Sequence, residues 1–219
     1  MQNELKSGSW GATAEKIRKC HLSLLSSETV KVEDWRDAFF SLIQSINDER
    51  KSDPAFACEL AQLTEATGIT YDFADILEEY FNFLEESKEW DLVIASADEL
   101  MELFKWENVM PSEYMFRKGN ALEQSKRFDE AEAFGQEWLR LYPTDLYAAA
   151  SNVFLMLELG KMKEAEELTE KYLRDELVCT DDTDTFFMAA YRLYELTDNI
   201  NAKQRVEKKM AEYQNLMNK

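Results

Sequence analysis

The fold of this chain is decided by two stretches, KRFDEAEAFGQEWL at residues 126–139 and GKMKEAEELTEKYL at residues 160–173. Ala131 and Ala165 occupy the same position in the two stretches, and each is the centre of a Glu-Ala-Glu tripeptide. Self-similarity at a fixed period of about 34 residues is typical of repeat proteins, in which each unit buries its apolar face against its neighbours. The sequence therefore predicts repeated pairs of antiparallel helices.

A weaker copy precedes these two stretches. In KEWDLVIASADELM, residues 88–101, Trp90 corresponds to Phe128 and Val93 to Ala131, at a spacing slightly longer than that between Ala131 and Ala165. Apolar residues at helical spacing continue on either side of the copies. These flanking regions are expected to form less regular helix pairs.

Gly119, Ala131 and Pro143 give the chain a resemblance to the tetratricopeptide repeat family. The unit of that family is a helix–turn–helix of about 34 residues with a small residue in each helix and a proline near its end. Met115 and Lys118 stand where the family pattern has Trp and Leu. The resemblance implies binding of peptides or protein segments in a concave groove.

The resemblance covers residues 74–175 and implies an all-α fold, a right-handed α-α superhelix (solenoid) of about five antiparallel helix pairs. We expect the repeat domain to span residues 33–219 and to end in a capping helix at about 199–217. Residues 1–32 are expected to form an N-terminal segment that is partly helical or irregular. Its SGSWG stretch has the composition of a loose start, from which Trp10 is expected to pack back onto the body.

The boundaries of one early helix are suggested by its end residues. Asp53 is a residue type that favours the N-cap position, and Pro54 favours the first helical position. Gly68 favours the helix end. The sequence therefore predicts a helix over residues 54–67.

The chain is strongly acidic, with 44 Asp and Glu against 25 Lys and Arg and a formal net charge of −19. Such a charge repels phosphate backbones, so we expect no direct nucleic-acid binding and a basic or neutral partner. Three widely spaced cysteines predict free thiols in a reducing compartment. No apolar run is long enough to span a bilayer, and the N-terminus lacks the apolar region of a signal peptide. We expect a cytoplasmic protein without a membrane span.

Catalytic and metal-binding patterns are lacking in the sequence. His21 is the one histidine, and no Ser-His-Asp, Cys-His, zinc or phosphate-loop motif can be assembled. Paired acidic residues are too common in so acidic a chain to indicate catalysis. We therefore expect no enzyme activity, no cofactor and no metal, with an enzyme of unrecognised type as a remote alternative.

The candidate binding residues follow from the resemblance, which places the first helix of each repeat on the groove. Two sets share one helix face through i, i+4 and i+7 spacing. They are Glu78, Asn82 and Glu85 in one repeat, and Phe116, Asn120 and Glu123 in the next. Asn82 and Asn120 occupy equivalent positions and can bond the backbone of an extended peptide. The alternative is that all six are ordinary groove residues.

The charges near these asparagines differ from those of family members that clamp a carboxylate. There the asparagine is accompanied by Lys and Arg, whereas here most neighbours are Glu, with Arg117 and Lys118 as exceptions.

The expected function is a protein- or peptide-binding adaptor or scaffold. One alternative is a regulatory subunit that senses a peptide or sequesters a basic partner on its acidic surface. The basic, amphipathic C-terminal helix could also bind a membrane surface or a partner helix, besides capping the repeat array.

Overall fold

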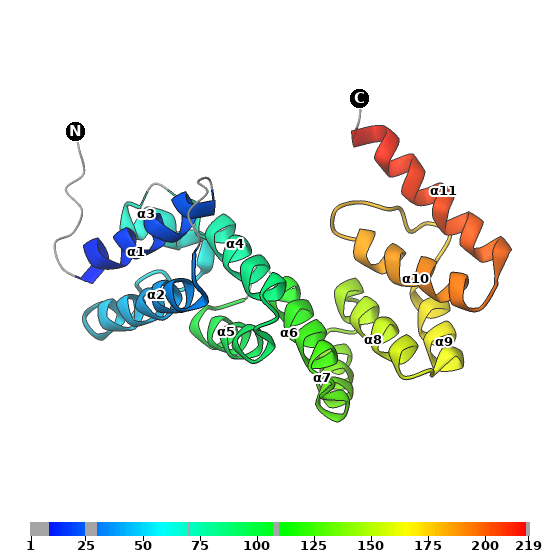
Figure 1. The fold of residues 1–219 in the computed structure, drawn as a ribbon. Helices are drawn as coiled ribbons and strands as arrows, with labels where there is room; N and C mark the ends of the chain where they lie inside the picture. Colours follow the sequence, from blue (N-terminus) through cyan, green and yellow to red (C-terminus); the bar gives the residue numbers. More distant parts are fainter. Residues whose placement is uncertain (1–8, 25–29, 70, 107–109, 218–219) are drawn as a thin grey trace. The chain divides into compact units, whose positions relative to one another are not determined.

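A computed structural model describes residues 9–24, 30–69, 71–106 and 110–217. Within these residues the chain forms eleven α-helices, one short 3-10 helix and no strand, so the all-α prediction is confirmed (Figure 1). The chain divides into two compact units, unit 1 (Met1–Pro111) and unit 2 (Ser112–Lys219). The division falls inside residues 33–219, which the sequence predicts to be one repeat domain.

Unit 1 is built around the contacts of its fourth helix. Its elements are α1 (Ser9–Leu24), α2 (Val32–Ser52), η1 (Leu60–Gln62), α3 (Leu63–Thr67), α4 (Phe73–Glu86) and α5 (Trp90–Leu103). Helices α1 and α2 pack together, and α4 contacts α1, α2 and α5. The ring of Tyr80 stacks on Phe39 with 4.7 Å between centroids, and its hydroxyl lies 2.8 Å from Ser96 Oγ. One aromatic side chain of α4 thus joins α2 to α5.

The start of α1 differs from the expected loose segment. Residues 7 and 8 lie outside the described residues, but the chain is helical from Ser9 onward. Trp10 is only 2% exposed; its ring lies 5.8 Å from that of Phe56, and its Nε1 donates to Glu49 Oε1 at 3.0 Å. Burial of this large side chain offsets the helix-weakening effect of Gly11. The prediction that Trp10 packs onto the body is confirmed, and that of an irregular start is wrong from Ser9 onward.

The predicted helix over residues 54–67 is wrong in its first half. The chain turns after Asp53, with Ala57 at a positive φ of 40°, and α-helix resumes only at Leu63. The Arg50 guanidinium stabilises this turn, because it donates to the carbonyls of Phe56 and Ala57 at 3.0 and 2.5 Å and to the distant Leu103 carbonyl at 2.6 Å. The guanidinium satisfies carbonyls that a helix would otherwise pair with its own N–H groups. Gly68 ends α3 in the left-handed conformation, as predicted.

Unit 2 is centred on its third helix. Its elements are α6 (Ser112–Gln124), α7 (Phe128–Leu141), α8 (Leu146–Glu158), α9 (Met162–Tyr172), α10 (Asp184–Leu196) and α11 (Ile200–Met217). Helix α8 packs against α6, α7, α9 and α10, and α11 packs against α10. Val206 of α11 is buried, and Met210 and Tyr213 pack against the same core. Leu216 and Met217 are exposed.

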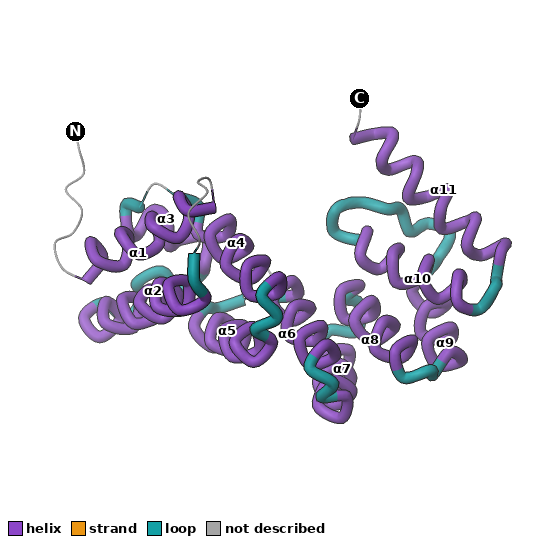
Figure 2. Tube along the Cα trace, viewed as in Figure 1, coloured by secondary structure: helices purple, strands orange, loops and turns teal. Residues whose placement is uncertain are grey.

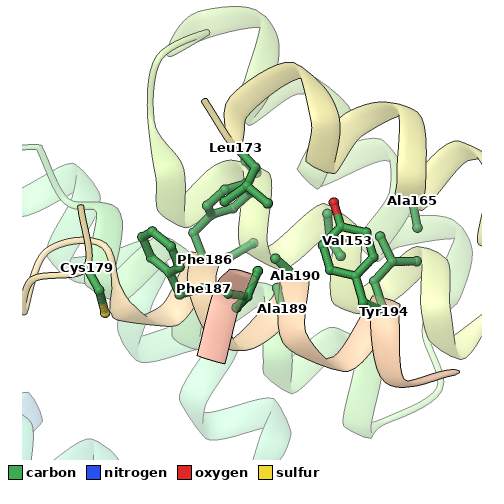
Figure 3. Packing of buried hydrophobic residues seen from close by; sticks show 13 residues of the cluster. Val153, Ala165, Leu173, Cys179, Phe186, Phe187, Ala189, Ala190 and Tyr194 are labelled. Carbon is green, nitrogen blue, oxygen red and sulfur yellow. The ribbon is translucent and has the colours of Figure 1, made fainter. Parts of the chain in front are cut away.

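The core of unit 2 combines alanines with large rings. Phe186, Phe187 and Tyr194 of α10 are fully buried in one cluster with Val153 of α8 and Ala165 of α9 (Figure 3). Small residues let helix axes approach, and the rings fill the space between them. The equivalent placement of Ala131 and Ala165 in the sequence therefore marks helix contacts, since both side chains are buried.

Four helix pairs share one turn conformation. Lys88, Lys126, Gly160 and Asp198 each have a positive φ, between 53° and 70°, in the turns of α4–α5, α6–α7, α8–α9 and α10–α11. In each turn the next residue donates its N–H to the carbonyl five residues earlier, at 2.8–3.0 Å. The interval between successive turns is shortest from Lys126 to Gly160 and slightly longer on either side of it. This recurrence is compatible with a helical repeat.

The differences in spacing arise between the hairpins. Helices α6, α8 and α10 have 13 residues each. By contrast, α9 ends at Tyr172 and α10 begins at Asp184, so a long connector joins these hairpins (Figure 2). Between α7 and α8 the connector is much shorter, from Leu141 to Leu146. Length therefore varies in the connectors and in the second helices, since α7 has 14 residues and α9 has 11, while the hairpin turns stay the same.

Candidate functional site

A pocket opens along the contact of α6 with α8, and three of the predicted site residues line it. Phe116, Asn120 and Glu123 come from one face of α6, as their spacing predicts. The pocket encloses about 270 Å³, and its lining residues are Phe116, Asn120, Glu123, Gln124, Ser151 and Phe154. We call it the α6–α8 pocket.

Gly119 lies where α6 meets the Ser151 face of α8 beside this pocket. A Cβ atom on Gly119 would lie 2.6 Å from Ser151 Oγ, well inside van der Waals contact. The Ser151 hydroxyl can rotate away, and the next nearest atoms, Phe134 Cε1 and Ser151 Cβ, are at the ordinary contact distances of 3.8 and 3.9 Å, so the two helices lie in close contact here. Phe154, one turn further along α8, is brought to the pocket by the same approach.

Asp145 holds the beginnings of α6 and α8 together. Its carboxylate is 6% exposed and accepts hydrogen bonds from Ser112 Oγ at 2.7 Å and Trp138 Nε1 at 2.9 Å. Its second oxygen accepts from the N–H of Tyr147 at 2.9 Å and so caps α8. One side chain thus fixes α6, α7 and α8 relative to each other at the end nearest Phe116.

Aromatic rings form one wall of the α6–α8 pocket. The rings of Phe116 and Phe154 lie 6.5 Å apart at an interplanar angle of 67°. Phe116 also packs edge-on against Tyr147, with 5.9 Å between centroids. Both phenylalanines are half-buried, so part of each ring faces the pocket. Such a wall can take an apolar chain or the flat face of a cation.

Glu123 supplies the one formal charge in the lining. Its side chain is half-buried, and burial raises the pKa of its carboxyl, with a further rise from nearby Glu158 and a smaller opposing effect of Lys126. Lys126 is itself engaged by Glu158 at 2.8 Å. The carboxylate of Glu123 thus carries a charge that its surroundings disfavour.

The two basic residues next to Asn120 in sequence do not line the pocket. Arg117 Nη2 pairs with Glu113 Oε1 at 3.1 Å. Lys118 Nζ stands 4.8 Å from the centre of the Phe134 ring. Neither side chain is among the lining residues, so the pocket keeps the negative charge of Glu123.

The equivalent residues of unit 1 lie on α4. Glu78 and Asn82 are exposed and Glu85 is half-buried, all on the face that the i, i+4 and i+7 spacing predicts. Asn82 precedes the left-handed Lys88 by the same interval as Asn120 precedes Lys126. None of the three lines either the α6–α8 pocket or the larger pocket of unit 1.

That larger pocket was not predicted from the sequence. It encloses about 310 Å³ and is lined by Glu59, Leu60, Ala61, Thr64, Asp72, Ala74, Lys105 and Trp106. Its walls depend on the turn after Asp53, where Lys105 N–H donates to the Cys58 carbonyl at 2.8 Å. No local pattern in the sequence signals this turn, because the Arg50 guanidinium that binds its carbonyls is also held by the distant Leu103 carbonyl.

The remaining reactive side chains have structural surroundings. His21 Nδ1 lies 2.8 Å from Glu79 Oε2, and its ring packs 5.0 Å from Tyr71. Burial raises the pKa of Cys20 to about 11, so its thiol stays protonated at neutral pH. Among the described residues, no group of three or more His, Cys, Asp or Glu side chains is arranged to hold a metal ion. No helix in the same residues has the length and apolarity that crossing a membrane requires.

No protein-family model matches the chain, and no curated protein matches it in sequence.

Proposed function

We propose that the chain is a protein- or peptide-binding adaptor or scaffold, and that unit 2 carries the binding site in the α6–α8 pocket. The observation that supports this is the composition of the pocket. Two phenyl rings, two amides, a hydroxyl and a carboxylate gather there from two successive hairpins. Such a mixture of apolar wall and polar groups is typical of sites that hold a ligand in a defined orientation.

The size of the pocket favours a side chain of a larger partner as its occupant. Its volume of about 270 Å³ lies just below the range of roughly 300–1,000 Å³ of small-molecule sites. A segment lying along α6 and α8 can insert one side chain here and bond its backbone to the Asn120 amide. The charge of Glu123 favours a basic or neutral segment.

The wider architecture supports the same proposal. Four hairpins with a common turn fit a helical repeat of the tetratricopeptide type, a right-handed superhelix whose first helices line a groove. Phe116, Asn120, Ser151 and Phe154 all lie on such first helices, α6 and α8. A face built this way presents side chains from neighbouring repeats to one extended partner.

The proposal is tested by selecting binders from a displayed library of random linear peptides on the full chain. The selected peptides are then measured against Asn120→Ala and Phe154→Ala, with the exposed Asn215→Ala on α11 as the matched control. We expect each pocket substitution to weaken binding about tenfold or more, the scale of a central contact, and the control to leave it unchanged.

Two further measurements test where the binding site lies. If Asn120→Ala and Phe154→Ala bind every selected peptide as the natural chain does, the α6–α8 pocket is not the site. Asn82→Ala then asks whether the equivalent face of α4 in unit 1 is the one used. Correct folding of each variant is checked by its circular dichroism spectrum.

A further inference from the structure

We propose that the α6–α8 pocket takes the guanidinium of an arginine side chain in the bound segment, with Glu123 as its counter-ion. This inference rests on the proposed function and adds the chemical identity of the anchoring group. It is carried by the arrangement of charge, rings and hydrogen-bond acceptors around the pocket.

The charge of the pocket favours a cation. Glu123 is half-buried, and Glu158 nearby adds repulsion instead of relief. Lys126, the basic residue whose charge acts on Glu123, is bound to Glu158 at 2.8 Å. An anionic ligand would increase the repulsion, whereas a cation would give the carboxylate the partner that burial otherwise denies it.

Unsatisfied polar groups point to the same kind of ligand. Within the described part of the chain, no hydrogen bond engages the side chains of Asn120, Glu123 or Ser151. The carboxylate oxygens, the amide oxygen and the serine hydroxyl can all accept, so the pocket offers several hydrogen-bond acceptors. A guanidinium carries five N–H donors in a planar fork, whereas an ammonium carries three on a compact centre.

The rings distinguish arginine from lysine. Phe116 and Phe154 are inclined to each other by 67° and present partly exposed faces to the pocket. A guanidinium is planar, weakly hydrated and stacks on aromatic faces, while an ammonium holds its water more strongly. Arginine can therefore place its plane against a phenyl ring and its edge toward Glu123.

The test uses small probes and nuclear magnetic resonance of the full chain. N-acetyl-arginine methylamide is titrated while the side-chain amide signal of Asn120 is followed, and N-acetyl-citrulline methylamide is the neutral isostere. We expect a saturable shift with arginine and about tenfold weaker binding of citrulline, because a charge-assisted pair is replaced by neutral hydrogen bonds. The lysine analogue should bind more weakly than arginine.

Variants of the chain complete the test. Glu123→Gln should lower arginine binding to the citrulline level, while the exposed Glu207→Gln on α11 should leave it unchanged. Phe154→Leu should weaken arginine binding and reduce the difference in affinity between the arginine and lysine analogues. Equal affinity for arginine and citrulline, or full arginine binding by Glu123→Gln, would overturn the inference.

The peptide selection separates this inference from the proposed function. Selected peptides that depend on Asn120 but contain no arginine would leave the binding function standing and remove the guanidinium anchor. Selected peptides that ignore the pocket substitutions would remove the function assigned to the pocket, whatever the small probes do.

Discussion

The side-chain amide of Asn152 on α8 donates to the main-chain carbonyl of Gly135 on α7, at 3.0 Å, inside the core of unit 2. The same amide donates to the Ala148 carbonyl at 2.8 Å. A Cβ atom on Gly135 would lie 2.6 Å from Asn152 Oδ1 and 2.9 Å from its Cγ and Nδ2. The close passage of α7 over α8 therefore depends on a glycine facing an asparagine.

Gly135→Ala is expected to destabilise the chain by about 3 kcal/mol, because the Asn152 amide must leave two buried carbonyls or strain the helices apart. Gly119→Ala is the matched control, since its Cβ meets the Ser151 hydroxyl, which can rotate away. Gly119→Ala should lower the free energy of unfolding by less than about 1 kcal/mol, because alanine has a higher helix propensity than glycine. Free energies of unfolding from urea titration compare the two, and equal losses would contradict this explanation.

Asp145→Ala should cost more than removal of an ordinary helix cap. It removes the acceptor of Ser112 Oγ and Trp138 Nε1 as well as the cap of α8, leaving buried donors without partners. We expect a loss of about 3 kcal/mol or more in the free energy of unfolding. Asp72→Ala, which removes an exposed cap with one bond to the N–H of Ala74, should cost about 1 kcal/mol. Similar losses at both positions would show that the contacts of Asp145 with Ser112 and Trp138 do not contribute to the free energy of unfolding.

Glu123→Gln is expected to raise the stability of the free chain at neutral pH. Burial raises the pKa of Glu123 in the folded state. Its carboxyl therefore favours folding most below the unfolded pKa, about 4.3, and this contribution is lost as the pH rises through the folded pKa. The glutamine side chain carries no charge at any pH and does not lose this contribution. The difference in free energy of unfolding between the variant and the natural chain should therefore shrink as the pH falls toward about 4. Thermal unfolding across this range, with Glu207→Gln as control, measures the difference.

The opposite trend, a variant less stable at neutral pH, would mean that Glu123 has a stabilising partner in the folded chain. The expected gain would instead show that a side chain of the pocket is kept at a cost to stability, which is common at binding sites.

The left-handed turns provide a reciprocal pair of substitutions. Gly160→Ala should destabilise by about 1 kcal/mol, because a positive φ is unfavourable for a residue with a side chain. Nothing lies within 4 Å of its added Cβ, so the effect is purely conformational. Asp198→Gly should stabilise by about 0.5–1 kcal/mol for the same reason. Urea titration checks both signs; a change of the same sign in both variants would rule out the conformational explanation.

Local sequence signals predicted much of unit 2 and part of its pocket. The small residues Ala131 and Ala165 are buried in helix contacts. Phe116 and Glu123 share a helix face because i, i+7 spacing is a property of any helix. Each of these features depends only on residues close in sequence, which is why the pattern could predict them.

Features that depend on distant residues were missed. The turn after Asp53 is stabilised by Arg50, which binds carbonyls from two segments, including Leu103 O at 2.6 Å. Phe154 and Ser151 enter the pocket through the packing of α8 on α6, which no local pattern specifies. One signal did exist: Phe154 occupies the position in its repeat that Asn120 occupies in the preceding one.

The common turn of the four hairpins also bears on how such a chain can change over evolutionary time. Residues gained or lost between Tyr172 and Asp184 leave the turn at Gly160 and the turn at Asp198 as they are. Insertions are therefore expected to be best tolerated in the exposed part of this connector, residues 174–176, away from its buried Leu173 and Cys179. Chains with this architecture can therefore come to differ in connector length and in surface residues while the structure of each hairpin is kept.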